Sequence, residues 1–177
     1  VLSATAILGY GFPMASFDEG LSRDPHLIAV DAGSTDPGPY YLGAGVSFTD
    51  RGAVKRDLEA MLIAGVGRGI PVVIGTAGGS GADRHLAWCR DIILEIAKEQ
   101  ALHFSMAVIR AEIPKEEVRR AMREGRVRPL SPAPELEEAA LEQTAAIVAQ
   151  MGVEPIIRAL DEGASLGDAL RYFRDIP

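Results

Sequence analysis

The chain has 177 residues, of which 47% are hydrophobic and 24% charged, a balance typical of a single soluble domain with a substantial core. Its formal net charge of −7 disfavours nucleic acid and anionic membranes as partners. No apolar stretch approaches the roughly 20 residues that a membrane-spanning helix needs. Cys89 is the single cysteine, which excludes an intrachain disulfide and fits a reducing cytoplasm.

Apolar runs typical of strands alternate along the chain with segments of helical period. Strands are expected in the opening stretch and at 26–30, 70–75 and 102–113. Helices are expected at 14–24, from 53 to the glycines at 65–69, from 83 to about 100, and at 114–124. Cys89 falls on the apolar face of its helix, so we expect it to be buried and unreactive.

Two more helices are expected towards the end of the chain. A Pro-rich linker at 129–134 leads to the first, whose apolar positions are Leu136, Ala140, Ile147 and Met151. The second spans 165–174, where Leu166, Leu170 and Phe173 form an apolar stripe at i, i+4 and i+7. That stripe should cover an apolar surface of its own chain or of a partner.

Alternation of strands and helices predicts a mainly parallel sheet with helices on both faces, that is, a three-layer, Rossmann-like α/β fold. The linker is interpreted as lying inside one domain that spans 1–177. Continuous apolar strands are what a sheet covered on both faces needs. The strand residues expected to be buried are Ile7, Val30, Val73, Ile74 and Val108.

Three of the expected strands end in unusual loops, at 9–13, 31–43 and 75–85. Ligands of parallel α/β sheets bind outside the carboxyl ends of the strands. All three loops should emerge at that edge. We therefore expect the 31–43 and 75–83 loops to lie side by side and to form one concave site, with Asp31 facing it.

The 75–85 loop is rich in glycine and precedes a helix. Its backbone N–H groups and the positive end of the helix dipole can bind a phosphate or carboxylate. The alternative is a tight turn capped by Asp83. The spacing matches neither G-x-G-x-x-G nor a P-loop. Arg84 either adds positive charge to an anion site or is a solvated residue at the helix start.

The 31–43 loop contains two acids and two tyrosines. Asp31 stands at a strand end, where it can act as a general acid or base, accept from a hydroxyl, bind a metal, or simply form an Asx-turn. Asp36 precedes Pro37, a common turn arrangement. A metal site is disfavoured because no histidine or third carboxylate is near. Tyr40 and Tyr41 either hydrogen-bond a substrate or pack in the core. The same two alternatives apply to Tyr10.

These considerations define the expected site. The expected catalytic residues are Asp31, Asp36 and Tyr40, and no metal ligand is assigned. The expected ligand-binding residues are Tyr10, Ser34, Tyr41, Gly78, Gly79, Ser80, Gly81 and Arg84. No serine lies in G-x-S-x-G, and His26 and His103 precede strands at the opposite edge, so a serine-hydrolase triad is not predicted.

Several segments together resemble the N-terminal part of the acyclic terpene utilisation AtuA family, a group built on a domain of unknown function. They are "VLSATAILGYGFP", "VDAGSTDPGPYYLGAG", "AVKRDLEAMLIA", "GIPVVIGTAGGSGADRHLAW" and "MGVEPIIRALDEGA". The resemblance runs from residue 1 to about 164, and "DAGSTDPGPYYLG" is its most specific stretch. Family chains are longer, so we expect this sequence to be either a short member or the N-terminal part of a longer chain.

The resemblance implies a role in the bacterial catabolism of branched isoprenoid acids, whose intermediates are CoA thioesters. It implies an enzyme that acts on a small carboxylic acid or its CoA thioester, as a lyase, hydratase or hydrolase. CoA would enter as part of the substrate, and no resident cofactor is expected. The alternative is a non-catalytic ligand-binding or accessory subunit whose site is completed by a partner chain. The protein is expected to form a homo-oligomer or to bind a partner subunit.

Overall fold

The structure is a computed structural model that describes residues 1–33, 39–163, 166–168 and 170–173. The described chain is mixed α/β. Its strands are β1 (Leu2–Ser3), β2 (Ile28–Asp31), β3 (Val72–Gly75), β4 (Met106–Val108), β5 (Leu166–Asp168) and β6 (Leu170–Phe173). They form one sheet in the order β1-β2-β3-β5-β4-β6, in which β4 and β6 are antiparallel and every other neighbouring pair is parallel.

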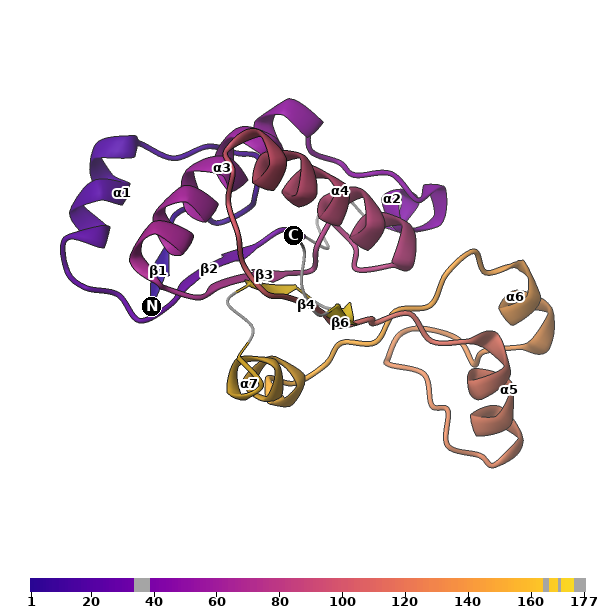
Figure 1. Cartoon of the computed structure of the whole chain (residues 1–177). Coiled ribbons are helices and arrows are strands. Elements are labelled where there is room, and N and C mark those ends of the chain that lie inside the picture. Colours follow the sequence, from indigo (N-terminus) through magenta and orange to yellow (C-terminus); the bar gives the residue numbers. More distant parts are fainter. Residues whose placement is uncertain (34–38, 164–165, 169, 174–177) are drawn as a thin grey trace.

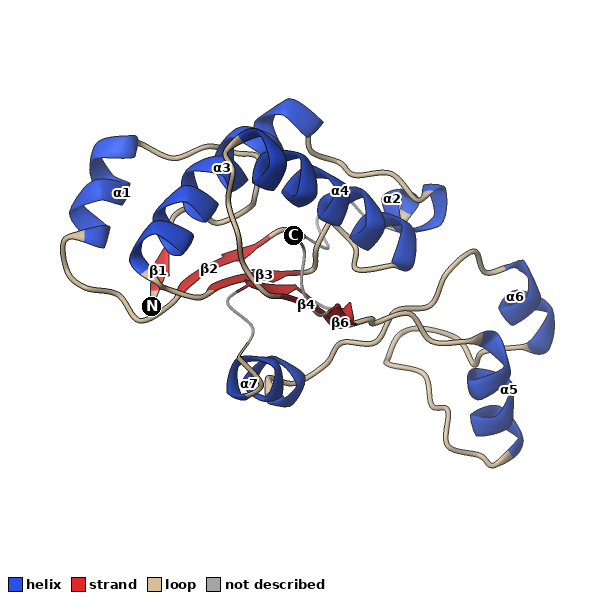
Figure 2. Ribbon diagram, in the orientation of Figure 1, coloured by secondary structure: helices blue, strands red, loops and turns tan. Residues whose placement is uncertain are grey.

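Helices connect these strands, as Figure 2 shows. Their bounds are α1 (Met14–Leu21), α2 (Tyr40–Ala44), α3 (Arg51–Arg68), α4 (Asp83–Glu99), α5 (Lys115–Arg123), α6 (Glu138–Gln143) and α7 (Glu154–Asp161). Local signals fix the ends of α3. The Asp50 carboxylate accepts a hydrogen bond from the Ala53 N–H at the start, and Gly69 adopts φ 65° at the end. No helix in the described part of the chain is long and apolar enough to cross a bilayer.

Chain direction explains which face each helix covers. The path from β1 through β2 and β3 to β4 moves in one direction across the sheet. Right-handed crossovers then place α1, α3 and α4 on the same face, where Figure 1 shows them. The return from β4 to β5 moves in the opposite direction, because β5 lies between β3 and β4. Accordingly, α7 lies on the opposite face (Figure 1).

The core lies between the sheet and the α3–α4 layer. Leu58, Met61, Leu62, Ile92 and Ile93 are fully buried there. They alternate with charged residues at the spacing that makes one face of each helix apolar. The expected burial of Cys89 is confirmed, because its side chain is 0% exposed.

Four of the five strand residues expected to be buried are buried, namely Val30, Val73, Ile74 and Val108. The prediction for Ile7 is wrong: Ile7 is only half-buried, and its neighbour Leu8 is buried instead. The opening strand is shorter than expected, because the chain leaves the sheet after Ser3. The Leu8 N–H then donates to the Asp31 carbonyl at 2.9 Å, beyond the last β1–β2 pair.

Both helices expected near the end of the chain require correction. The one carrying residues 136–151 is a single short helix, α6, after which the chain becomes extended and Val148 pairs with Glu112 in an antiparallel bridge. The segment expected to be a helix at 165–174 contains strands β5 and β6. β3 and β4 stand one strand apart, and β5 supplies the backbone hydrogen bonds that both of their facing edges require.

Helices α5 and α6 form an arm that lies beyond the β4–β6 end of the sheet (Figure 1). Two extended segments join it to the sheet, and they pair through hydrogen bonds from the Ile113 N–H to the Ile147 carbonyl and from the Ala149 N–H to the Ala111 carbonyl. The basic run of α5 is neutralised within the arm. Arg119 by itself forms ion pairs with three acidic residues, Glu116, Glu138 and Glu142.

Candidate functional site

An open cavity of about 950 Å³ lies at the carboxyl ends of β2 and β3. Its wall comes from the chain just after β2, the start of α2, the loop between β3 and α4, the chain after β4, and the chain that leads into α7. Most of this wall is apolar. The polar side chains in the described wall are those of Asp31, Thr76, Ser80 and Gln150.

The topology explains why a cavity forms at this place. The chain after β3 turns to the α4 face, whereas the chain after β4 leads through the arm to α7 on the other face. Connections that diverge to opposite faces of a sheet leave a crevice at the strand ends. Ala111 and Val148, on the two paired segments at the base of the arm, also line the cavity, and a Cβ atom on Gly81 of the loop after β3 would lie 4.0 Å from Ala111 Cβ.

Asp31 is the last residue of β2 and lines the cavity, in register with Gly75 of β3. Its Oδ1 accepts a hydrogen bond of 2.9 Å from the Gly33 N–H, which is an Asx-turn. Within the described residues, Oδ2 has no protein partner. The turn geometry holds the carboxylate in place at the cavity wall.

The loops after β2 and β3 are in close contact beside Asp31. A Cβ atom on Gly33 would lie 2.6 Å from Thr76 Cβ and 2.7 Å from the Gly79 carbonyl oxygen. Thr76 has φ 51°, a left-handed conformation that is rare for a β-branched residue. The Gly79 N–H donates to the Thr76 carbonyl at 2.9 Å and closes the turn. Such strain is typical of functional loops that their surroundings hold in one conformation.

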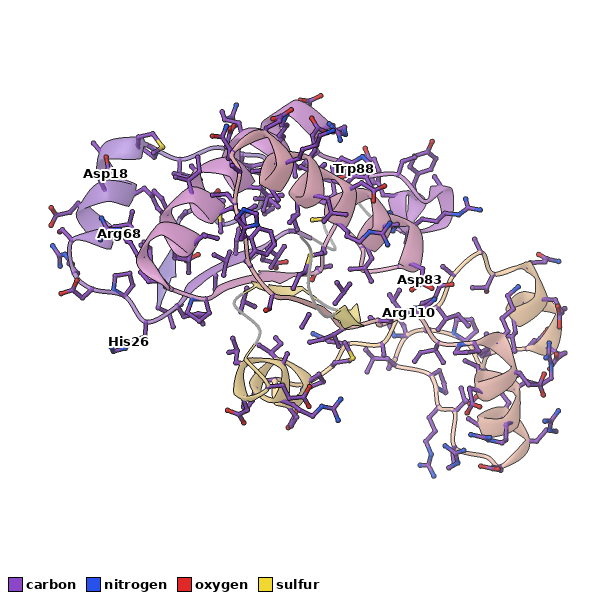
Figure 3. The ribbon with its side chains drawn as sticks, viewed as in Figure 1. Asp18, His26, Arg68, Asp83, Trp88 and Arg110 are labelled. Atoms are coloured by element: carbon purple, nitrogen blue, oxygen red, sulfur yellow. The ribbon has the colours of Figure 1, made fainter. Side chains whose placement is uncertain are left out.

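The start of α4 differs from the expected anion site. A carboxylate oxygen of Glu112, which follows β4, accepts the Asp83 N–H at 2.8 Å. Glu112 therefore takes the first of the N–H groups at the helix start that a ligand anion was expected to use. Asp83 does not cap the helix either, since its carboxylate pairs with Arg110, and the two side chains point toward each other in Figure 3.

Four of the expected site residues are brought together at the cavity. They are Asp31, Gly79, Ser80 and Gly81. Ser34 and Asp36 lie outside the described residues. Thr76 and Gln150 were missed. Thr76 could have been found from its place directly after β3, whereas Gln150 reaches the wall through the long-range Glu112–Val148 pairing, which leaves no local signal.

The other expected residues do not line the cavity. Tyr10 and Tyr40 are 66% and 70% exposed, and Tyr41 packs edge-on against Phe48. Arg84 is exposed and packs against Gly45, where a Cβ atom would lie 2.8 Å from Arg84 Cδ. Gly78 faces the backbone of α4 at His85, whose Cα would lie 2.7 Å from a Cβ at Gly78. None of these residues is among those that line the cavity.

The 9–13 loop, the third of the expected pocket loops, is bound to α3 instead of to the cavity. The Asp57 carboxylate is 2% exposed, and its Oδ2 accepts hydrogen bonds of 2.9 Å from both the Gly9 and Gly11 N–H groups. Its Oδ1 accepts from Arg56. This buried acid was not predicted, and its role is to anchor the loop.

A buried histidine connects α2 to α4 behind the cavity wall. His85 is 1% exposed, and its Nε2 lies 3.1 Å from both the Tyr41 and Val46 carbonyl oxygens. Since both neighbours are acceptors, Nε2 carries the proton and donates to them. The Nδ1 atom is buried and has no partner among the described residues. His26, in contrast, lies at the far end of the sheet, as expected (Figure 3).

The described residues contain no cluster of three or more histidine, cysteine or acidic side chains that could hold a metal ion. Comparisons of the chain with protein-family models, curated proteins and solved structures gave no match. The resemblance to the AtuA family therefore stays a prediction, and function must be inferred from the cavity together with that resemblance.

Proposed function

We propose that the protein is a bacterial catabolic enzyme that acts on a small carboxylic acid or its CoA thioester and binds the acyl part in the cavity at the ends of β2 and β3. One observation carries the proposal. The Asp31 carboxylate, with one oxygen held by the Gly33 N–H, lines a cavity whose walls are otherwise mostly apolar. A cavity of about 950 Å³ lies within the range of small-molecule sites.

We treat the fold as a three-layer, Rossmann-like arrangement, in which α7 is the described helix on the face of the sheet opposite α1, α3 and α4. In such folds the crevice between diverging connections is the usual ligand site. Asp31 stands at that crevice by its position at the end of β2. The Asp31–Gly75 register brings it beside the loop between β3 and α4.

Asp31 is assigned the acid–base role. Lyase, hydratase and hydrolase reactions of acyl compounds all move a proton close to the carbonyl group, and a carboxylate in an apolar wall suits that task. The branched hydrocarbon would lie against the apolar side chains, among them Leu42, Ile109 and Ile156. The cytoplasm would be the site of action, which agrees with the single buried Cys89.

The test compares wild-type protein with Asp31→Asn in a thermal-shift screen of acyl-CoAs and short branched acids, followed by turnover assays on each compound that binds. A ligand at about 100 times its Kd should add about 2.7 kcal/mol to the free energy of unfolding. Asp31→Asn should keep the fold and lose turnover. Asp18→Asn, on the exposed α1 surface (Figure 3), is the matched control and should behave like the wild type. Full turnover by Asp31→Asn would refute the assignment.

A non-catalytic binding or accessory subunit is the second candidate function. It is favoured by one observation, namely that the described cavity wall contains Thr76 and Ser80 but no histidine or cysteine to form a nucleophile–base pair. Such a subunit would bind acyl compounds without turning them over and would form an oligomer or bind a partner chain. Ligand binding without turnover, together with a larger mass in light scattering, would favour it over the enzyme.

A further inference from the structure

The described wall of the cavity carries negative charge only. Among the described lining residues Asp31 is the charged one, and no lysine, arginine or histidine belongs to that set. The remaining polar side chains, Thr76, Ser80 and Gln150, are neutral. An anion that entered the cavity would meet a negative carboxylate and no cation from this part of the wall.

The helix start beside the cavity does not compensate for this. A helix N-terminus attracts anions through its unpaired N–H groups and its dipole. Here the Glu112 carboxylate already accepts the first N–H of α4, from Asp83, at 2.8 Å. The Arg110 guanidinium forms an ion pair with the Asp83 carboxylate. The first N–H of α4 and the Arg110 guanidinium are therefore both bound to carboxylates of the chain itself.

The apolar part of the wall adds a second constraint. Charged groups lose hydration when they enter an apolar cavity, and that loss must be offset by a partner of opposite sign. For a free carboxylate the described wall offers none. For an O–H or N–H group the Asp31 carboxylate is a strong acceptor.

We propose that the cavity selects a branched apolar ligand whose polar end carries no negative charge and offers an O–H or N–H donor to Asp31, and that it excludes the free carboxylate. For the proposed function this narrows the substrate from an acid or its thioester to a hydroxyacyl thioester, with the negative phosphates of CoA remaining outside. The inference rests on the proposed function because it concerns the same cavity, but charge selection can be measured without turnover.

The test uses three probes that share one branched carbon skeleton and differ in charge, namely 2-ethylhexanol, 2-ethylhexanoate and 2-ethylhexylamine. Isothermal titration at pH 7.5 measures Kd for each with the full chain. The alcohol and the amine should bind, and the carboxylate should bind at least tenfold more weakly than the alcohol. Asp31→Asn should reduce that difference to about threefold or less. Asp31→Glu, which keeps the charge, should retain it, and so should Asp18→Asn.

The outcomes separate this inference from the proposed function. Carboxylate binding as tight as that of the alcohol, or discrimination that survives in a folded Asp31→Asn protein, overturns the charge selection. Binding of none of the probes overturns it as well. If Asp31→Asn does not fold, the charge selection is judged from the affinities of the wild type and Asp31→Glu for the alcohol and the carboxylate. Discrimination by charge without turnover of any acyl thioester would support the selection and reject the enzymatic function.

Discussion

Gly33 and Thr76 come from loops that follow different strands, yet they are packed so closely that no room remains between them for a Cβ atom on Gly33. A Cβ atom at Gly33 would lie 2.6 Å from Thr76 Cβ, a separation that real Cβ atoms do not show. Thr76 itself adopts a left-handed φ of 51°. The contact fixes the two loops beside Asp31, so the position of the carboxylate depends on a glycine two residues further along the chain.

Gly33→Ala should therefore disturb both loops. Overpacking of this kind typically costs about 1–3 kcal/mol of the free energy of unfolding. Here the Gly79 carbonyl, a backbone atom 2.7 Å from the added Cβ, cannot simply rotate away. Gly43→Ala is the control, because open space surrounds that position. Urea unfolding gives the midpoint of each variant. Equal midpoints for the two would contradict the close packing of Gly33 against Thr76 and Gly79.

Regular elements with strong local signals were predictable from the sequence. Strands β2 and β3 and helices α3 and α4 follow continuous apolar runs and a clear helical period, and the parallel pairing of β2 with β3 follows from the helix between them. The placement of Asp31 at the cavity follows from the same rule. Parallel strands present their carboxyl ends at one edge of the sheet.

The remaining features depend on contacts between residues far apart in the chain. Leu166, Leu170 and Phe173 have helical spacing, but a short apolar run fits a strand equally well. The unpaired edges of β3 and β4 decide in favour of the strand. The cap on α4 comes from Glu112, 29 residues beyond Asp83. Local pattern cannot reveal such partners, so the sequence did not indicate that Glu112 would accept the first N–H of α4.

His85 should be essential for the position of α2. His85→Leu introduces an apolar side chain of similar reach and removes the N–H that the Tyr41 and Val46 carbonyls share. A lost donor to buried acceptors costs about 1–3 kcal/mol. His85→Gln retains an N–H donor and should recover part of that loss. Thermal unfolding measures both. If Leu and Gln variants are equally stable, the two hydrogen bonds contribute nothing to stability.

The Glu95 carboxylate joins α4 to α3 and should make stability depend on pH. Hydrogen bonds from Arg51 and Lys55 lower the pKa of Glu95 from 4.5 to about 2. Since the folded pKa is the lower one, the stabilising effect is complete above pH ~4.5 and disappears as the pH falls toward 2. Glu95→Gln should therefore be less stable than the wild type at neutral pH and equal to it near pH 2.

The size of the Glu95 effect should be small, because the side chain is 36% exposed and salt screens such pairs. Thermal unfolding from pH 7 to pH 2, at 20 mM and 500 mM NaCl, measures it. The matched control is Glu19→Gln, which removes a single exposed pair with Arg23, four residues further along the chain. A Glu95→Gln penalty that persists unchanged at pH 2 would show that packing, not charge, connects the two helices.

Glu112→Ala should release the start of α4 and change which ligands the cavity accepts. Loss of an N-terminal cap costs about 1 kcal/mol of stability, so the variant should fold with a modestly lower unfolding midpoint. The freed Asp83 N–H and the positive helix end can then attract an anion. Binding of 2-ethylhexanoate should tighten by about threefold or more, while binding of 2-ethylhexanol stays the same. Glu137→Ala, at an exposed residue of the arm, controls for loss of a negative charge elsewhere. Unchanged carboxylate affinity in a folded, destabilised Glu112→Ala protein would mean that Glu112 caps the helix without shaping the charge selection.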